Sequence, residues 1–173
     1  GGNQPQIYDG SAVITVNGKP AIDNVGSDFL QLSTTLSLTD FMFTAYVNRS
    51  TTSNAGMIAG NNAGSGNYIW DRLVITTFNA GGNITNMSGS STTGKKLYVL
   101  NRNSNALTLR VNASEIDTDT NSGTWSLGTI MSAYTGNAFD MRNEFHEVII
   151  WDSNQSSNLT GIETDINDYF SIY

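Results

Sequence analysis

The run Phe145-His146-Glu147-Val148-Ile149-Ile150-Trp151-Asp152 decides the fold that this sequence predicts. Its β-branched and aromatic residues indicate a strand. A Ser- and Asn-rich turn follows, and apolar side chains then recur at helical spacing at Leu159, Ile162, Ile166 and Tyr169 or Phe170. Thr160 and Glu163 have the spacing of a capping box, and Asn158 is an alternative cap. The sequence therefore predicts a strand and one short C-terminal helix at the end of the chain.

The rest of the chain alternates apolar and polar side chains with the two-residue period of a β-strand. In residues 41–47, for example, Phe41, Phe43 and Val47 share one face. Further strands are predicted at residues 73–78, 96–100, 106–111 and 129–133. Clusters of Gly, Asn and Ser separate them, at residues 61–67, 79–83, 88–94 and 119–123. Many short strands joined by turns predict an all-β sandwich or barrel.

Residues 1–173 form one predicted domain, because no linker, repeat or internal boundary interrupts this pattern. The start, Gly1-Gly2, has neither an initiator Met nor a signal sequence. We therefore expect these two residues to be an expression-vector remnant or a processed end. The domain is then expected to be one piece of a longer protein.

Uncharged polar residues dominate the composition, with 21 Asn, 20 Thr and 19 Ser against only 13% charged residues. The net charge is −7, and Lys95-Lys96 is the only pair of adjacent basic residues, so we expect no nucleic-acid partner. There are no cysteines, which removes disulfides and thiolate metal sites. No stretch approaches the roughly 18 apolar residues that cross a bilayer, so no membrane span is expected.

Both ends of the chain resemble laminin-G-like and concanavalin A-like jelly-roll domains of phage and bacterial surface proteins. Such domains often end on a strand with Glu before aliphatic residues and an aromatic-Asp pair, then a short helix and a Tyr-rich terminus, as in residues 147–152 and 162–169. Near the start, the similar stretches are residues 4–9, 17–23 and 26–30. One departure is Asn143, near which relatives often place a Gly.

This resemblance implies a two-sheet antiparallel β-sandwich of the concanavalin A-like jelly-roll type. It also implies, for many members of the group, the binding of a glycan or a receptor, while other members are purely architectural. A fold does not by itself determine a function.

Catalysis is the minority interpretation. Related glucanases use two carboxylates on one face of a strand, which requires an even separation. Glu144 and Glu147 are three residues apart, so in a regular strand without a bulge they face opposite sides. Glu147 and Asp152, five apart, fail in the same way. His146 is the only histidine, and on this strand a packed or edge position is the commoner outcome. We expect no enzyme, with a secreted polysaccharide hydrolase as an alternative.

A calcium site is a second possibility, because calcium takes carboxylate, amide and carbonyl oxygens. Asp117 and Asp119 are two residues apart and would place two carboxylates together. Asp140 with Asn143, or Asp23 with Asn24 and Asp28, are the other options. The plainer interpretation, turn capping by Asp and Asn, is favoured for all of them.

Glycan binding requires an aromatic ring flanked by planar hydrogen-bonding side chains. The best such set follows a Gly- and Asn-rich loop and consists of Tyr68, Trp70, Asp71 and Arg72. A second set is Trp125 with Asn121, and a third lies in residues 134–143 with Asp140 and Arg142. Trp70 and Trp125 stand beside turn signals, which favours partial exposure, whereas Trp151 lies inside a strand and is expected in the core.

The sequence thus favours a non-catalytic carbohydrate-binding or receptor-recognition module of a phage fibre or a bacterial surface protein. Its expected location is extracellular or on the virion surface, and its expected ligand is a cell-surface glycan or polysaccharide. We expect a homo-oligomer, with a trimer favoured, which would add avidity. The competing interpretation is a structural virion or decoration domain with no glycan ligand.

Overall fold

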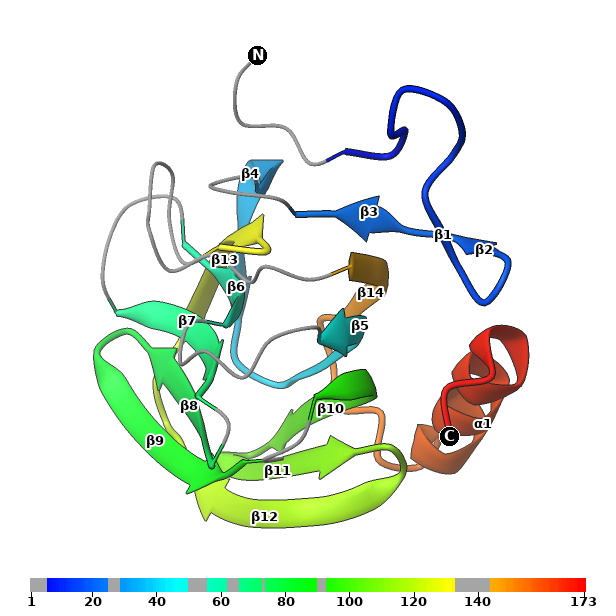
Figure 1. Cartoon of the computed structure of the whole chain (residues 1–173). Coiled ribbons are helices and arrows are strands. Elements are labelled where there is room, and N and C mark those ends of the chain that lie inside the picture. Colours follow the sequence, from blue (N-terminus) through cyan, green and yellow to red (C-terminus); the bar gives the residue numbers. More distant parts are fainter. Residues whose placement is uncertain are drawn as a thin grey trace.

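The computed structural model describes residues 6–24, 29–49, 56–61, 66–72, 74–89, 93–132 and 144–173. Two six-stranded antiparallel sheets face each other, and one helix, α1 (Leu159–Phe170), lies outside one of them (Figure 1). The prediction of a two-sheet antiparallel sandwich with a short C-terminal helix is confirmed. A two-stranded hairpin, β1 (Thr15–Val16) and β2 (Lys19–Pro20), stands apart from both sheets.

The sheet beside α1, called sheet I, has the order β12-β11-β10-β5-β14-β3. Its strands are β12 (Ser114–Thr120), β11 (Ala106–Val111), β10 (Gly94–Asn103), β5 (Phe41–Arg49), β14 (Glu144–Trp151) and β3 (Ile22–Asp23). The other, sheet II, has the order β4-β13-β6-β7-β8-β9. Its strands are β4 (Leu30–Leu38), β13 (Trp125–Ile130), β6 (Met57–Gly60), β7 (Asn67–Asp71), β8 (Ile75–Ala80) and β9 (Asn83–Ser88).

The core between the sheets follows from the alternation within the strands. Phe41 and Phe43 of β5 point inward, and both rings contact the ring of Trp125, at centroid distances of 5.1 and 5.6 Å. Phe78 of β8 completes the aromatic cluster at 5.5 Å from Trp125. These rings are fully buried, and aromatic pairs of this kind add about 0.5–1.5 kcal/mol each beyond the burial of their area.

The other face of β5 is buried too, because α1 covers it. Met42 and Tyr46 of β5 pack with Ile166 and Phe170 of the helix and with Ile172 after it. The helix begins at Leu159, after Asn158, whose side chain makes no capping hydrogen bond. The predicted capping box is therefore wrong, since Thr160 already lies inside the helix.

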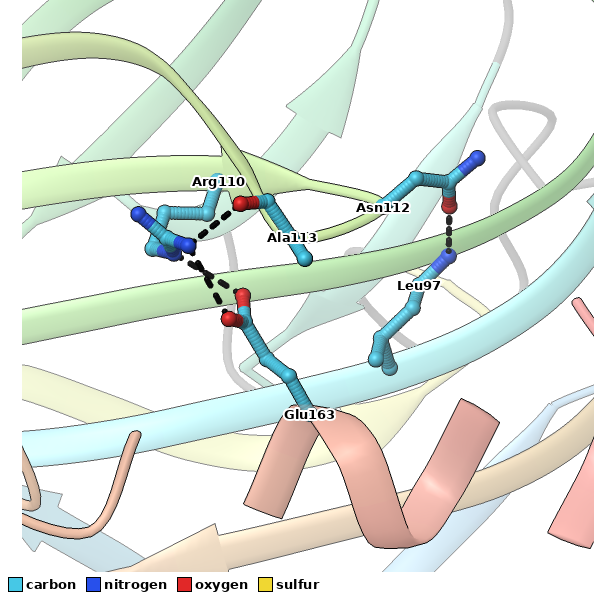
Figure 2. A network of polar contacts seen from close by, with 5 residues as sticks. All are labelled: Leu97, Arg110, Asn112, Ala113 and Glu163. Atoms are coloured by element: carbon cyan, nitrogen blue, oxygen red, sulfur yellow. Dashed lines mark hydrogen bonds and ion pairs between the residues drawn. The ribbon is translucent and has the colours of Figure 1, made fainter. Parts of the chain in front are cut away.

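Glu163 instead anchors the helix to sheet I (Figure 2). Its carboxylate accepts hydrogen bonds from Arg110 of β11, with Nε–Oε1 and Nη2–Oε2 distances of 2.9 and 3.0 Å. Arg110 also donates to the Ala113 carbonyl, and in the same turn Asn112 Oδ1 accepts from the Leu97 backbone N–H at 2.8 Å. A bidentate, charge-assisted contact of this kind fixes both the position and the rotation of α1.

A β-bulge at His146 changes which side chains of β14 share a face. Phe145 pairs with Val47 and Glu147 with Tyr46, so His146 has no partner of its own on β5. Glu144 pairs with Asn48, two residues beyond Tyr46, so both glutamates lie on the α1 side of sheet I. The prediction that Glu144 and Glu147 face opposite sides is therefore wrong, because it assumed a regular strand.

Candidate functional site

Tyr68 and Trp70 form an aromatic pair on the outer face of sheet II. They alternate with Ile69 and Asp71, which point between the sheets and are buried. The two rings meet edge to face, with centroids 6.2 Å apart and an interplanar angle of 82°. Arg72, which is exposed, places its guanidinium carbon 4.5 Å from the centre of the Trp70 ring. Three of the four residues of the best predicted set are thus together at one site.

The neighbouring strands add polar groups to this face. Asn79 and Thr77 of β8 stand directly opposite Tyr68 and Trp70, and Asn86 of β9 stands opposite Thr77. Thr77 Oγ1 donates a hydrogen bond to Asn86 Oδ1 at 2.8 Å. We call the set Tyr68, Trp70, Arg72, Thr77, Asn79 and Asn86 the aromatic face.

Asn79 is the residue of this face whose side chain most clearly lacks a hydrogen-bond donor. Asn79 is only 4% exposed, and its Oδ1 is buried with no hydrogen-bond partner in the part of the chain that the structure describes. An unpaired buried acceptor costs about 1–3 kcal/mol, which a ligand hydroxyl or amide could recover. Sequence reasoning missed Asn79 because it falls in a Gly/Asn cluster that indicated a turn, whereas it belongs to β8.

The fourth member of that set, Asp71, does not belong to the aromatic face. Its carboxylate is fully buried between the sheets, where it forms an ion pair with Arg49 and accepts a hydrogen bond from the Tyr98 hydroxyl. Burial, reinforced by the Asp71 carboxylate, raises the pKa of Tyr98 well above its ordinary value. Lys96 is also buried nearby, and its pKa is lowered mainly by burial. Asp71 is thus part of an interior polar cluster, and its carboxylate helps to neutralise the positive charges there.

The second predicted set is also interior. Trp125 has no exposed surface, so the prediction of partial exposure is wrong and its ring cannot stack on a ligand. The error arises because Trp125 is the first residue of β13 and points inward at once. Asn121 is 1% exposed, and its Nδ2 donates to the Asn83 carbonyl and to Thr85 Oγ1, at 2.9 and 3.0 Å. Asn121 therefore joins the end of β12 to β9. Asp140 and Arg142 lie outside the described residues.

The proposed calcium ligands Asp117 and Asp119 accept backbone hydrogen bonds. Asp117 Oδ2 accepts from Ser88 N–H at 2.7 Å and Oδ1 from Thr118 N–H at 2.8 Å, which lowers the pKa of this carboxyl. Asp119 Oδ1 accepts from Thr120 N–H at 2.7 Å. Within the described ranges there is no group of three or more His, Cys, Asp or Glu that could hold a metal ion. Of the other options, Asp28, Asp140 and Asn143 lie outside those ranges.

The glutamates near the bulge form a separate polar region. Glu144 Oε2 accepts a hydrogen bond from Asn48 Nδ2 at 2.6 Å. Burial raises the pKa of Glu147 and lowers that of His146, which stacks on Tyr46 at 4.2 Å with the planes 17° apart. Of the cavities formed by described residues, the two that Glu147 lines are not lined by Glu144. His146 is packed, as expected.

No family model matches the sequence, and neither does any curated protein. Several solved structures are similar in fold. One is domain 4 of AbnA, a GH43 extracellular arabinanase from Geobacillus stearothermophilus, in complex with arabinotriose. Its TM-score is 0.67 at 13% identity, over 92% of this chain and 86% of that domain. Another is the CBM40 of the Ruminococcus gnavus IT-sialidase bound to α2,3 sialyllactose, with a TM-score of 0.60 at 9% identity, over 84% of this chain and 97% of that one.

A third similar structure is the heptameric SAP-like pentraxin of Limulus polyphemus, with a TM-score of 0.54 at 12% identity, over 84% of this chain and 76% of that one. At such identities the likeness shows a common fold, which is consistent with the concanavalin A-like type that the sequence suggested. In the described part of the chain, the one helix is too short and too polar to cross a bilayer.

Proposed function

We propose that this chain is a non-catalytic carbohydrate-binding module that holds its ligand on the aromatic face of sheet II. The observation that carries the proposal is the buried Oδ1 of Asn79, which has no hydrogen-bond partner among the described residues, on the residue that pairs with Tyr68. A sugar offers apolar C–H faces to aromatic rings and hydroxyl donors to such an acceptor. The exposed Arg72 guanidinium supplies donors at the rim of the same face.

Two of the structures with this fold were solved with sugars bound, arabinotriose and sialyllactose. That supports a glycan as the ligand class, while the choice among neutral and acidic sugars depends on the groups around Asn79. Arg72 favours a ligand that presents a carboxylate or several acceptor oxygens, because a guanidinium donates and never accepts.

The finer context of the proposal comes from the ends of the chain. Their resemblance to phage and bacterial surface domains supports a fibre or surface protein, extracellular or on the virion, that recognises a cell-surface glycan. In such a protein, repetition of the module in a trimer would turn weak single sites into tight binding. Sedimentation equilibrium of the full-length protein tests the trimer, and a monomeric mass at micromolar concentration would contradict it.

Glycan-array binding followed by titration calorimetry tests the ligand. We expect Trp70→Ala and Asn79→Ala each to weaken binding of the best glycan by about tenfold or more, as loss of a central contact does. Tyr169→Ala, which removes an aromatic side chain that is 57% exposed on α1, is the matched control and should leave binding unchanged. Absence of any glycan bound by the wild-type protein would favour the structural alternative.

The hydrolase alternative has its own measurement. Release of reducing sugar from a polysaccharide by the wild-type protein, lost in Glu147→Gln, would overturn the non-catalytic assignment. We expect no release from either protein, because Glu144 does not line the described cavities that Glu147 lines.

A further inference from the structure

Within the described ranges, strand β14 is unpaired along most of one edge. On one side it pairs with β5 from Glu144 to Trp151, but on the other side it pairs with β3 only at Glu144 and Phe145. The chain leaves this edge at Pro20, which has no N–H to donate. The Ala21 N–H donates its hydrogen bond to the Ile14 carbonyl and not to β14. Among the strands that the structure describes, none borders residues 147–151 on the side away from β5.

The residues along this edge are typical of a strand that has a partner on each side. Val148, Ile149, Ile150 and Trp151 all favour β-structure. Proteins usually protect a free edge with Lys, Pro or a bulge, and here the bulge at His146 precedes the free part and no Lys or Pro lies within it. About half of the backbone groups in an edge strand point away from its single partner, so they are available to an added strand.

The inner side of this edge opens into an apolar cavity of about 250 Å³ between the two sheets. Val148 and Ile150 of β14 line one wall, and Leu30 and Leu32 of β4 line the opposite wall. Figure 1 shows this end of the sandwich at the top of the view, where β3 and β4 lie, opposite the end where β9 and β12 lie. Side chains that project inward from an added strand would enter a mainly apolar surrounding here.

The outer side of the same edge has a different chemistry. A cavity of about 320 Å³ is lined by Glu147 and Ile149 of β14 and by Asp165, Ile166 and Tyr169 of α1. Two carboxylates beside an aromatic ring favour a cationic side chain. The Tyr169 ring already holds one ammonium group, because Lys19 Nζ lies 3.9 Å from its centre. The chain as a whole carries a net charge of −7.

We propose that the free edge of β14 takes up an extended segment of a partner polypeptide by strand addition. The segment pairs with residues 147–151 and alternates two kinds of side chain, because successive residues of a strand face opposite sides. Its apolar side chains enter the cavity between the sheets, and its Lys or Arg side chains face Glu147 and Asp165. This interaction is independent of the aromatic face, which lies on the other sheet.

A short fluorescent peptide of alternating valine and lysine, titrated with the full chain and followed by anisotropy, tests the proposal. Asp165→Lys should weaken binding by about tenfold or more. Asp168→Lys, which makes the same charge change on an exposed residue of α1 outside the cavity, should weaken it by about twofold or less. Equal effects of the two variants would mean nonspecific attraction to an acidic protein and would overturn the proposal.

A matched pair of variants tests the inner cavity as well. Leu30 and Leu36 both lie on β4 with exposed fractions of 40% and 38%, and only Leu30 lines the cavity. Leu30→Lys should therefore weaken peptide binding strongly and Leu36→Lys only slightly, while both proteins stay folded by circular dichroism. The reverse order would contradict the assignment of this cavity.

Backbone pairing is tested by N-methylating alternate residues of the peptide. Only one of the two methylated sets removes the N–H groups that face β14, so one should fail to bind and the other should bind as the parent does. Equal behaviour of the two sets would overturn strand addition. So would a two-fold dimer of the chain that forms without peptide and is dissociated by Asp165→Lys, because the occupant would then be a second copy.

Discussion

Arg110 and Glu163 form the ion pair that ties α1 to sheet I. The side chain of Glu163 is 3% exposed and that of Arg110 is 18% exposed, so solvent screens the pair only from the arginine side. The side-chain hydrogen bond to Glu163 raises the pKa of Arg110, whose charge is therefore permanent. Removing the negative partner leaves a half-buried cation unpaired, which costs more than the pair itself contributes.

We therefore expect Glu163→Gln to lower the free energy of unfolding by about 1–3 kcal/mol, measured by urea denaturation. Asp168→Asn changes an exposed carboxylate on the same helix and should stay within about 0.5 kcal/mol of the wild type. A Glu163→Gln protein as stable as this control would show that the pair does not hold the helix.

His146 gives the protein a pH dependence of known sign. Burial, with help from Lys95, lowers the pKa of His146 in the folded state, while the Pro20 backbone opposes the shift. As the pH falls below about 6.5, the unfolded chain therefore takes up the proton first, and stability is lost down to the folded pKa. Glu147 acts in the opposite sense, because burial raises its pKa and its stabilising contribution is lost as the pH rises.

The difference between the wild type and His146→Phe isolates the histidine, which is the only one in the chain. As the pH falls below about 6.5, we expect the free energy of unfolding of the wild type to fall relative to that of His146→Phe, in urea titrations at each pH. Parallel curves for the two proteins would contradict a neutral, buried His146.

Strand β14 owes its orientation to the bulge. Because His146 has no partner on β5, its removal leaves Phe145 opposite Val47 and Glu147 opposite Tyr46. Every later side chain then keeps its face. Loss of a residue further along the strand has a different result, because a shift by one residue moves all following side chains to the other side of the sheet.

Deletion of His146 should therefore give a soluble, folded protein that is less stable mainly through loss of the Tyr46 contact. Deletion of Ile149 should abolish folding, because Ile150 and Trp151 would change faces. Soluble yield and near-ultraviolet circular dichroism compare the two. Equal damage from both deletions would mean that the extra residue itself is required.

The molecule is closed at one end by bonds between the two sheets and covered on one side by α1. At the closed end, Ser88 N–H donates to Asp117 Oδ2, and Thr85 Oγ1 donates to the Thr120 carbonyl at 3.1 Å. On the covered side, α1 hides the apolar outer face formed by Met42, Leu97 and Val99. A face of this kind without its helix is prone to association.

A chain that ends at residue 157 should therefore bind the dye anilinonaphthalene sulfonate and form polydisperse aggregates in sedimentation experiments, while the 173-residue chain should bind no dye and sediment as a single species. A truncated protein that stays monomeric and dye-free would show that sheet I is stable without α1.

Calcium removal tests the other interpretation of Asp117 and Asp119. Because their backbone hydrogen bonds already occupy three of the four carboxylate oxygens, we expect chelator and added calcium to leave the melting temperature unchanged. A calcium-dependent rise that is lost in Asp119→Asn would instead identify a calcium site.

The sequence by itself determined the all-β character, the closing helix and the closeness of Tyr68, Trp70 and Arg72, because local periodicity and local spacing are written along the chain. Only the tertiary structure decided which aromatic ring is buried, since Trp125 and Trp70 stand in similar contexts but face opposite sides of their strands. The same holds for Asn79, which reaches Tyr68 through the pairing of β7 with β8. Strand register, the His146 bulge and the free edge of β14 depend on which strands meet, and pairing between distant segments leaves no mark on either segment alone.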